Sequence, residues 1–239
     1  ISHEVAALAG HQRLGKLIWI FDDNRITIEG ATDLSSSTDQ IDRFHGYHWH
    51  IQHVEDGTDL DALDQALTAA RGAADRPSLI VMTTRIGEGS PNKVGHHSTH
   101  GAPLGDDEIS ATKTNLAYPS QEPFHVDPDG LAAWRAAGDR GSRLQADWST
   151  RFEAYRVEHP QLAEEFNRMM AGDLPADWDA EIPGFETVDK ADATRSWSGK
   201  VLQAVAAGVP NLIGGSADLG SSNKTDIDGG GDLSAENPE

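Results

Sequence analysis

The sequence of 239 residues contains no cysteine, no long apolar run and far fewer basic than acidic residues, 19 against 39. Without cysteine, a disulfide framework and a thiolate-ligated metal site are excluded. No apolar run approaches the roughly 20 residues that a membrane-spanning helix needs, and we expect no signal peptide. The net charge of −20 disfavours nucleic acid and anionic membrane as partners. We therefore expect a cytoplasmic protein that binds neither nucleic acid nor membrane.

The two ends of the sequence do not resemble the ends of a complete domain. The chain lacks an initiating methionine and opens at Ile1 in a stretch typical of a helix start. It closes with DIDGGGDLSAENPE, which has a loop composition. We expect the sequence to be a fragment of a longer protein.

The most informative stretch is LIWIFDDNRITIEG, at residues 17–30. Its apolar start predicts a strand buried on both faces, as in a parallel sheet. Asp22, Asp23 and Asn24 follow at the carboxyl end of that strand, where open α/β sheets bind ligands. The Asn24 side-chain carbonyl and the Ile26 main-chain carbonyl are oxygen ligands of the kind that Mg²⁺ takes, together with phosphates and water. The same polar residues are also typical turn formers, and this alternative stays open.

Two further apolar runs, at residues 49–54 and 79–82, are predicted strands. Helical patterns precede and separate the strands, and another helix is predicted at residues 106–116. This alternation predicts an α/β fold with a parallel sheet and flanking helices.

A glycine-rich segment at residues 85–105 contains His96, His97 and His100. Long segments of this kind inside a compact domain are usually functional or disordered. The histidines suggest zinc, but the His-x-x-His spacing is not diagnostic and no acidic ligand stands at a standard offset. His100 alone, as a partner for a phosphate or an oxyanion, is the favoured hypothesis. The glycines do not form GxGxxG after a strand, so a dinucleotide site is not supported.

The carboxyl-terminal half has a different character. Residues 128–170 are predicted to be helical, with an aromatic stripe typical of packing, and residues 171–189 read as a linker. A helix and a short strand at residues 212–213 are expected to follow. Arg195, close to the helix start, suits an anionic substrate or a surface carboxylate, and Ser222 lies in a polar loop compatible with ordinary turn chemistry.

Six motifs along the chain resemble the transketolase family in their order and spacing. They are ISHE at 1–4, DDNRITIEG at 22–30, GSPNK at 89–93, HGAPLG at 100–105, TR at 194–195 and GGSADL at 214–219. The resemblance implies a thiamine diphosphate-binding α/β fold. It implies that residues 1–125 are the carboxyl half of the diphosphate-binding domain, residues 126–189 a helical segment and interdomain linker, and residues 190–239 the start of an α/β pyrimidine-binding domain.

The resemblance also implies an activity. The family is homodimeric, uses thiamine diphosphate with Mg²⁺ or Ca²⁺, and moves a two-carbon ketol unit from a ketose phosphate to an aldose phosphate in the pentose phosphate pathway. Carried over residue by residue, the resemblance implies that Asn24 and Ile26 bind the metal and that the catalytic His100 contacts cofactor and substrate. It implies that Arg195 and Ser222 bind the sugar phosphate. Asp218 would contact the partner subunit's cofactor, and Glu4 would belong to an acidic cluster at the dimer interface.

Some family features are missing or altered. The Gly-Asp-Gly metal segment would precede Ile1, and the glutamate that activates the pyrimidine ring is also absent. Ser196-Trp197 and Gly220-Ser221 depart from the common pairs, which bears on the placement of Ser222. A related ketol transferase such as a dihydroxyacetone synthase, or a non-catalytic module that kept the fold, are the alternatives. The isolated fragment is expected to be inactive.

Overall fold

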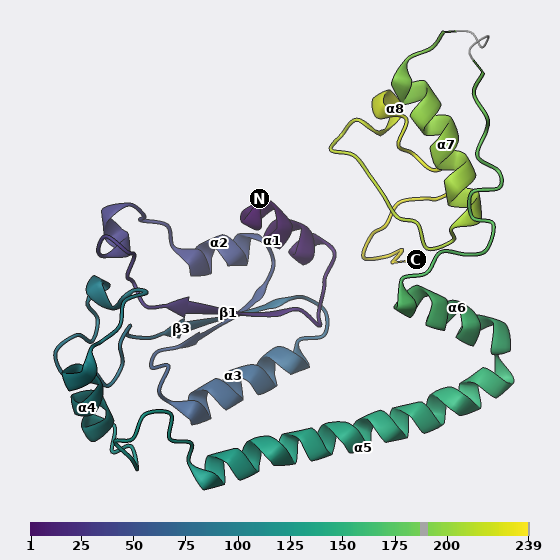
Figure 1. Ribbon diagram of the computed structural model, residues 1–239. Helices are drawn as coiled ribbons and strands as arrows, with labels where there is room; N and C mark the ends of the chain where they lie inside the picture. The colour runs from purple at the N-terminus through teal and green to yellow at the C-terminus, as the bar shows by residue number, and fades with distance from the viewer. Residues whose placement is uncertain (187–190, 239) are drawn as a thin grey trace. The chain divides into compact units, whose positions relative to one another are not determined.

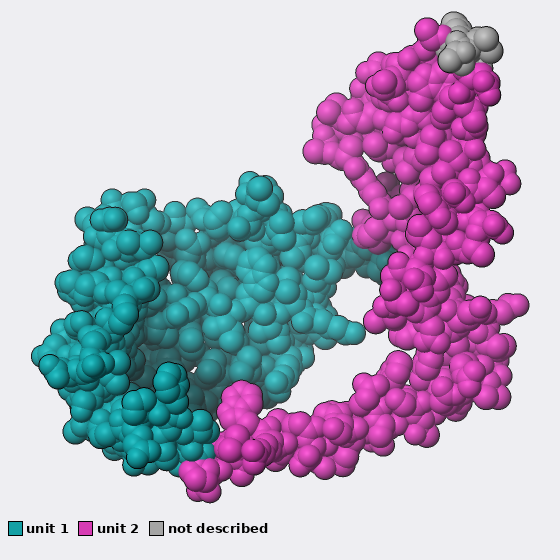
Figure 2. Space-filling view, viewed as in Figure 1, with its two compact units in different colours: residues 1–127, 234–239 teal, residues 128–233 magenta. Residues whose placement is uncertain are grey.

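The computed structural model describes residues 1–186 and 191–238, and the chain divides into two compact units (Figures 1 and 2). The first unit comprises Ile1–Asp127 and Ser234–Glu239, and the second comprises Pro128–Leu233. The domain boundary that the sequence predicts between residues 189 and 190 lies outside the described residues. Among the described helices, none combines the length and the apolar character needed to cross a membrane.

The first unit is built on a three-stranded parallel sheet with the strand order β1-β3-β2. Its elements in chain order are α1 (Ser2–His11), β1 (Ile18–Asp23), η1 (Thr32–Leu34), α2 (Gln40–Gly46), β2 (His50–Val54), α3 (Leu60–Gly72), β3 (Ser78–Thr83), η2 (His97–Thr99) and α4 (Asp106–Asn115). Ser78 of β3 pairs in register with Ile18 of β1 and with His50 of β2. The three predicted strands and their parallel arrangement are therefore confirmed.

Helices cover both faces of this sheet (Figure 1). On one face, α1 and α2 pack over Leu79 and Val81 of β3, with Trp49 completing a buried cluster. On the other face, Ala66 and Ala70 of α3 pack against Ile80 of β3. Successive side chains of the central strand β3 are therefore buried on opposite faces of the sheet, and this is why the sequence of β3 is a continuous apolar run.

The strand β1 differs from the sequence prediction. The sequence predicts burial on both faces, yet Ile20 is 48% exposed and Phe21 is 39% exposed. The reason is its position, because β1 is an outer strand of this sheet and the helices pack mainly over β3. A short apolar run identifies a strand but not its place in the sheet order.

Gly10 marks a close approach between α1 and the turn before β2. A Cβ atom at Gly10 would lie 1.8 Å from the carbonyl oxygen of Tyr47, a backbone atom that cannot rotate away. The nearby Trp49 indole N–H donates to the Ala6 carbonyl oxygen at 2.9 Å and holds the same two segments together. Both contacts depend on α1 lying directly on this turn.

We expect Gly10→Ala to destabilise the protein, because α1 must shift away from the sheet. Overpacking of this kind costs about 1–3 kcal/mol or more. Chemical denaturation of the complete protein checks the expectation. Gly46→Ala is the matched control, since a Cβ there meets nothing within 4 Å. Equal unfolding midpoints for the two variants would contradict the predicted contact.

The second unit consists, in its described part, of helices and irregular segments. The helices are α5 (Pro128–Glu158), α6 (Pro160–Ala171), α7 (Thr194–Gly208) and α8 (Gly220–Asn223). The rings of Trp148 and Phe152 stack at 5.0 Å, and Phe166 of α6 lies 5.3 Å from Phe152. Part of the predicted aromatic stripe therefore packs α5 against α6, although no residue of α5 is buried and Trp134 is 80% exposed.

The short strand predicted at residues 212–213 is wrong. These residues are irregular, and the Ile213 side chain is 80% exposed. A strand is stabilised by hydrogen bonds to a neighbouring strand, and the described part of this unit contains no strand with which residues 212–213 could pair. The Leu-Ile pair alone could not reveal the missing partner.

Candidate functional site

The segment after β1 forms a small hairpin at the carboxyl edge of the sheet. The Ile26 N–H donates to the Asn24 Oδ1 atom at 3.0 Å, and Ile26 bridges to Ala31 in antiparallel fashion. Arg25, between the two proposed metal ligands, has a φ of 58°. This left-handed conformation folds the chain so that the Asn24 side chain lies beside the Ile26 main chain. Both residues are half-buried. Asn24 Oδ1 has a second lone pair, which leaves it able to accept a cation.

The glycine-rich loop after β3 lies beside this hairpin. The His97 Nδ1 atom is 3.2 Å from the Ile28 carbonyl oxygen, so the Nδ1–H tautomer donates across the two loops. The loop is closed at its base by the Gly95 N–H, which donates to the Ile86 carbonyl oxygen at 2.7 Å. His100 follows η2 at once and is exposed. The structure thus brings the loop of His100 next to the segment of Asn24 and Ile26.

The three histidines do not form a zinc site in the described residues. The His96 Nδ1 atom bonds the Ser98 hydroxyl at 2.8 Å, and the His96 and His97 rings lie 4.4 Å apart. In the described chain, no group of three or more His, Cys, Asp or Glu residues could hold a metal ion. An amide oxygen with a main-chain carbonyl is a different donor set, made of hard oxygens that suit Mg²⁺ or Ca²⁺.

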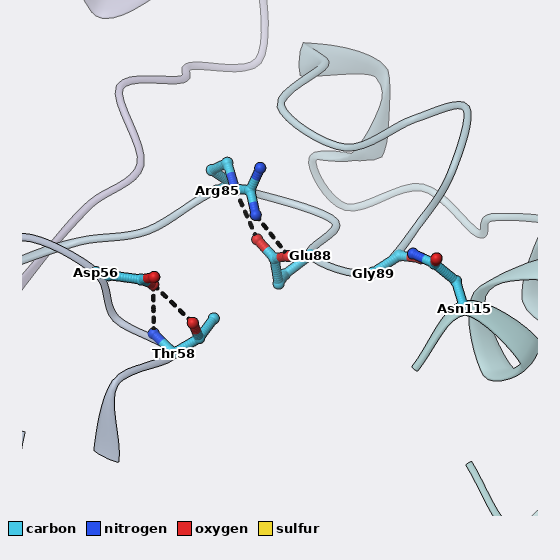
Figure 3. Close-up of polar contacts among 6 residues, drawn as sticks. All are labelled: Asp56, Thr58, Arg85, Glu88, Gly89 and Asn115. Atoms are coloured by element: carbon cyan, nitrogen blue, oxygen red, sulfur yellow. Dashed lines mark hydrogen bonds and ion pairs between the residues drawn. The ribbon is translucent and has the colours of Figure 1, made fainter. Parts of the chain in front are cut away.

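The turns after β2 and β3 complete this edge of the sheet (Figure 3). Asp56 accepts hydrogen bonds from the Thr58 hydroxyl at 2.7 Å and the Thr58 N–H at 2.9 Å, which lower the pKa of its carboxyl below the usual range. Arg85 pairs with Glu88 at 2.8 Å. These charges are satisfied locally and shape the turns.

Glu108, at the start of α4, has a role that the sequence did not predict. Its carboxylate accepts hydrogen bonds from the Ser90 hydroxyl and from both the main-chain and side-chain N–H groups of Asn92, each of these two at 2.9 Å. The Ser90 hydrogen bond, followed by those of Asn92, lowers the pKa of Glu108 to about 2. The run Asp106-Asp107-Glu108 indicates only a helix start, and no local signal points to the distant loop.

The remaining predicted site residues lie in the second unit. Arg195 is in the first turn of α7, and Ser222 is in α8, which packs against α7. Their neighbours Ser196 and Ser221 line one cavity, so these parts of the two helices meet. Asp218 has a φ of 61° in the turn that leads into α8. All three predicted residues are exposed.

Comparison with known proteins identifies relatives for this arrangement. Residues 1–175 match the family described as "Transketolase, thiamine diphosphate binding domain". The chain is 45% identical over 234 residues to a transketolase of Nostoc sp., covering 98% of this chain and 35% of that protein. It is 43% identical over 229 residues to transketolase 2 of Escherichia coli, covering 94% and 34%.

Solved structures give the same result. A transketolase of Pichia stipitis, described as a complex with sedoheptulose 7-phosphate, superposes with a TM-score of 0.92 at 39% identity and covers 98% of this chain and 34% of its own. A Campylobacter jejuni transketolase superposes with a TM-score of 0.86 at 30% identity, covering 99% and 35%. The chain therefore spans about a third of the length of the relatives it matches. Its strands, its loops and its sequence together show that this chain belongs to the transketolase family.

Proposed function

We propose that the complete protein is a transketolase, which transfers a two-carbon ketol unit from a ketose phosphate to an aldose phosphate with thiamine diphosphate and Mg²⁺. The observation that carries the proposal is the placement of Asn24 and Ile26 at the carboxyl end of β1, beside the loop that ends at His100. Open α/β sheets bind ligands at this edge. The family match over residues 1–175 supports the same cofactor.

The residues present fit a metal-bound diphosphate. Asn24 supplies an amide oxygen and Ile26 a main-chain carbonyl oxygen, and such neutral oxygens leave room for phosphate oxygens and water around Mg²⁺ or Ca²⁺. His100 is exposed at the end of η2, where it can hold a phosphate oxygen or steady charge at the reacting carbon. When bound, thiamine diphosphate supplies the reactive carbon that carries the ketol unit, and the protein binds and orients it.

The second unit contributes the proposed substrate and partner contacts. Arg195, at the start of α7, is proposed to bind the sugar phosphate through paired N–H groups, with Ser222 of α8 as a second donor. Asp218 is proposed to approach the cofactor of a second subunit. This assignment requires a homodimer, in which Glu4 of α1 joins an acidic cluster at the interface.

The pathway and the compartment are proposed on the same basis. The proposed ketol transfer between sugar phosphates is assigned to the pentose phosphate pathway, and the cytoplasm is the proposed location. The relatives from Nostoc and Escherichia coli have no organelle in their names, whereas the one from Arabidopsis thaliana is named chloroplastic. The domain limits proposed are 1–125, 126–189 and 190–239.

The activity test uses the complete purified protein. It is incubated with xylulose 5-phosphate and ribose 5-phosphate, with and without thiamine diphosphate and Mg²⁺, and the sugar products are separated and identified. Formation of a seven-carbon ketose that requires both additions supports the proposal. Cofactor binding without transfer to ribose 5-phosphate would favour a ketol transferase with another acceptor, and no cofactor binding would favour a non-catalytic module.

The metal assignment gives a separate prediction for Asn24. In the complete protein, Asn24→Ala removes one of few protein oxygens, so we expect the apparent Kd for thiamine diphosphate to rise by about tenfold or more at limiting Mg²⁺. Ile26→Val is the matched control, because only the main-chain carbonyl of this residue is assigned to the metal. Cofactor binding across a Mg²⁺ titration checks both variants. An unchanged titration for Asn24→Ala would remove Asn24 from the site.

A further inference from the structure

The GSPNK segment at residues 89–93 is held by one carboxylate. Glu108 Oε1 accepts from the Ser90 hydroxyl and the Asn92 main-chain N–H, and Oε2 accepts from the Asn92 side-chain amide. Hydrogen bonds to an ionised acceptor are roughly twice as strong as those between neutral groups. A single side chain of α4 therefore fixes a segment that lies 16 to 18 residues earlier in the chain.

Further hydrogen bonds connect the Glu108–Ser90 contact to both ends of the loop that contains the three histidines. Ser90 is only 1% exposed, and its hydroxyl oxygen accepts the Lys93 N–H at 3.1 Å. The Lys93 ammonium in turn donates to the Leu104 carbonyl oxygen at 2.8 Å. Residues 94–103, which include all three histidines of the segment, thus run between two anchored points.

The far end of α4 anchors the start of the same segment. The Asn115 side-chain amide donates to the Gly89 carbonyl oxygen at 2.9 Å, and Figure 3 shows Asn115 directed toward Gly89. Gly89 has a φ of 84°, and a Cβ there would lie 2.5 Å from Leu116. Both ends of α4 therefore hold the GSPNK segment by hydrogen bonds, and Glu108 provides the charged contact.

We propose that Glu108 is a positioning residue that holds the loop of residues 89–104 in the shape that presents His100 to the cofactor. This inference rests on the proposed function. The lowered pKa of Glu108 agrees with it, since the carboxylate stays ionised well below neutral pH. The group acts through the loop, and nothing requires it to touch the cofactor itself.

The first part of the test measures loop structure and does not depend on activity. Glu108→Ala, Glu108→Gln and Asp107→Asn are made in the complete protein, and amide hydrogen exchange is followed by mass spectrometry. Asp107 is an exposed carboxylate in the same helical turn and controls for the loss of charge at the start of α4. We expect faster exchange at Asn92 and Lys93 in Glu108→Ala, unchanged exchange in β3, and parent-like behaviour in Asp107→Asn.

The second part connects the loop to the cofactor. The apparent Kd for thiamine diphosphate is expected to rise about 10- to 100-fold in Glu108→Ala, as for other groups that orient a ligand-binding residue. Glu108→Gln, which keeps one accepting oxygen for Ser90 and the Asn92 main-chain N–H, should recover part of this loss. In a His100→Ala background, Glu108→Ala should add little, because both changes disable the same contact.

The outcomes distinguish a failure of the positioning role of Glu108 from a failure of the proposed function. Unchanged exchange at Asn92 and Lys93 in Glu108→Ala would overturn the positioning role outright. Losses in cofactor affinity that add fully in the double variant would also overturn it, because Glu108 would then act on overall stability and not through His100. Faster exchange with no cofactor binding by the parent protein would refute the proposed function.

Discussion

The 239-residue chain expressed by itself is expected to transfer no ketol unit between pentose phosphates at any Mg²⁺ concentration. It spans about a third of the length of its relatives, and the resemblance to the family implies that other segments contribute to the catalytic site. The resemblance places a metal-binding Gly-Asp-Gly segment before Ile1 and the pyrimidine-activating glutamate beyond the span. Asn24 and Ile26 alone then offer a metal too few ligands to retain the cofactor.

The isolated chain is also expected to be poorly soluble or partly unfolded. The outer strand β1 exposes Ile20 and Phe21, and an uncovered edge strand with apolar side chains promotes association between chains. Sedimentation and circular dichroism of the expressed span measure its solubility and its folded content.

The activity assay of the expressed span uses xylulose 5-phosphate, ribose 5-phosphate, thiamine diphosphate and Mg²⁺. Turnover above background that disappears in Asn24→Ala would contradict the prediction and show that the span is self-sufficient.

His100→Ala in the complete protein is expected to lower turnover by about 10²- to 10³-fold, the range observed when one charge-stabilising donor is removed from an active site. His100 is exposed and directly follows the short 3₁₀ helix η2, so its removal should leave the unfolding midpoint nearly unchanged. Steady-state kinetics and thermal unfolding, measured on the same preparation, separate a loss of chemistry from a loss of fold.

The neighbouring histidines provide the controls. His96→Ala should have little effect, because its Nδ1 atom contacts the hydroxyl and the main-chain N–H of the nearby Ser98, within the same short turn. His97→Ala removes the contact to the Ile28 carbonyl oxygen and should have a smaller effect than His100→Ala. If all three variants lost activity alike and released zinc, a metal cluster would replace the proposed role of His100.

Local patterns in the sequence determined the elements of the first unit. The apolar runs predicted the strands because a strand of a parallel sheet is buried along its length, and the helical patterns between them predicted the flanking helices. In the structure, Asp39 and Asp59 accept N–H groups at the starts of α2 and α3. The order of the motifs identified the family. It also singled out Asn24, Ile26 and His100, whose assigned roles stay predictions.

Only the tertiary structure decided how these elements combine. The order β1-β3-β2 makes β1 an outer strand, although its sequence is as apolar as that of a buried one. Residues 212–213 form no strand, since pairing depends on a neighbour that a short apolar run cannot specify. Glu108 appeared to be an ordinary acidic residue of a helix start, yet its carboxylate binds Ser90 and Asn92. Periodicity reports on residues three or four apart, whereas such hydrogen bonds depend on the path of the chain between distant segments.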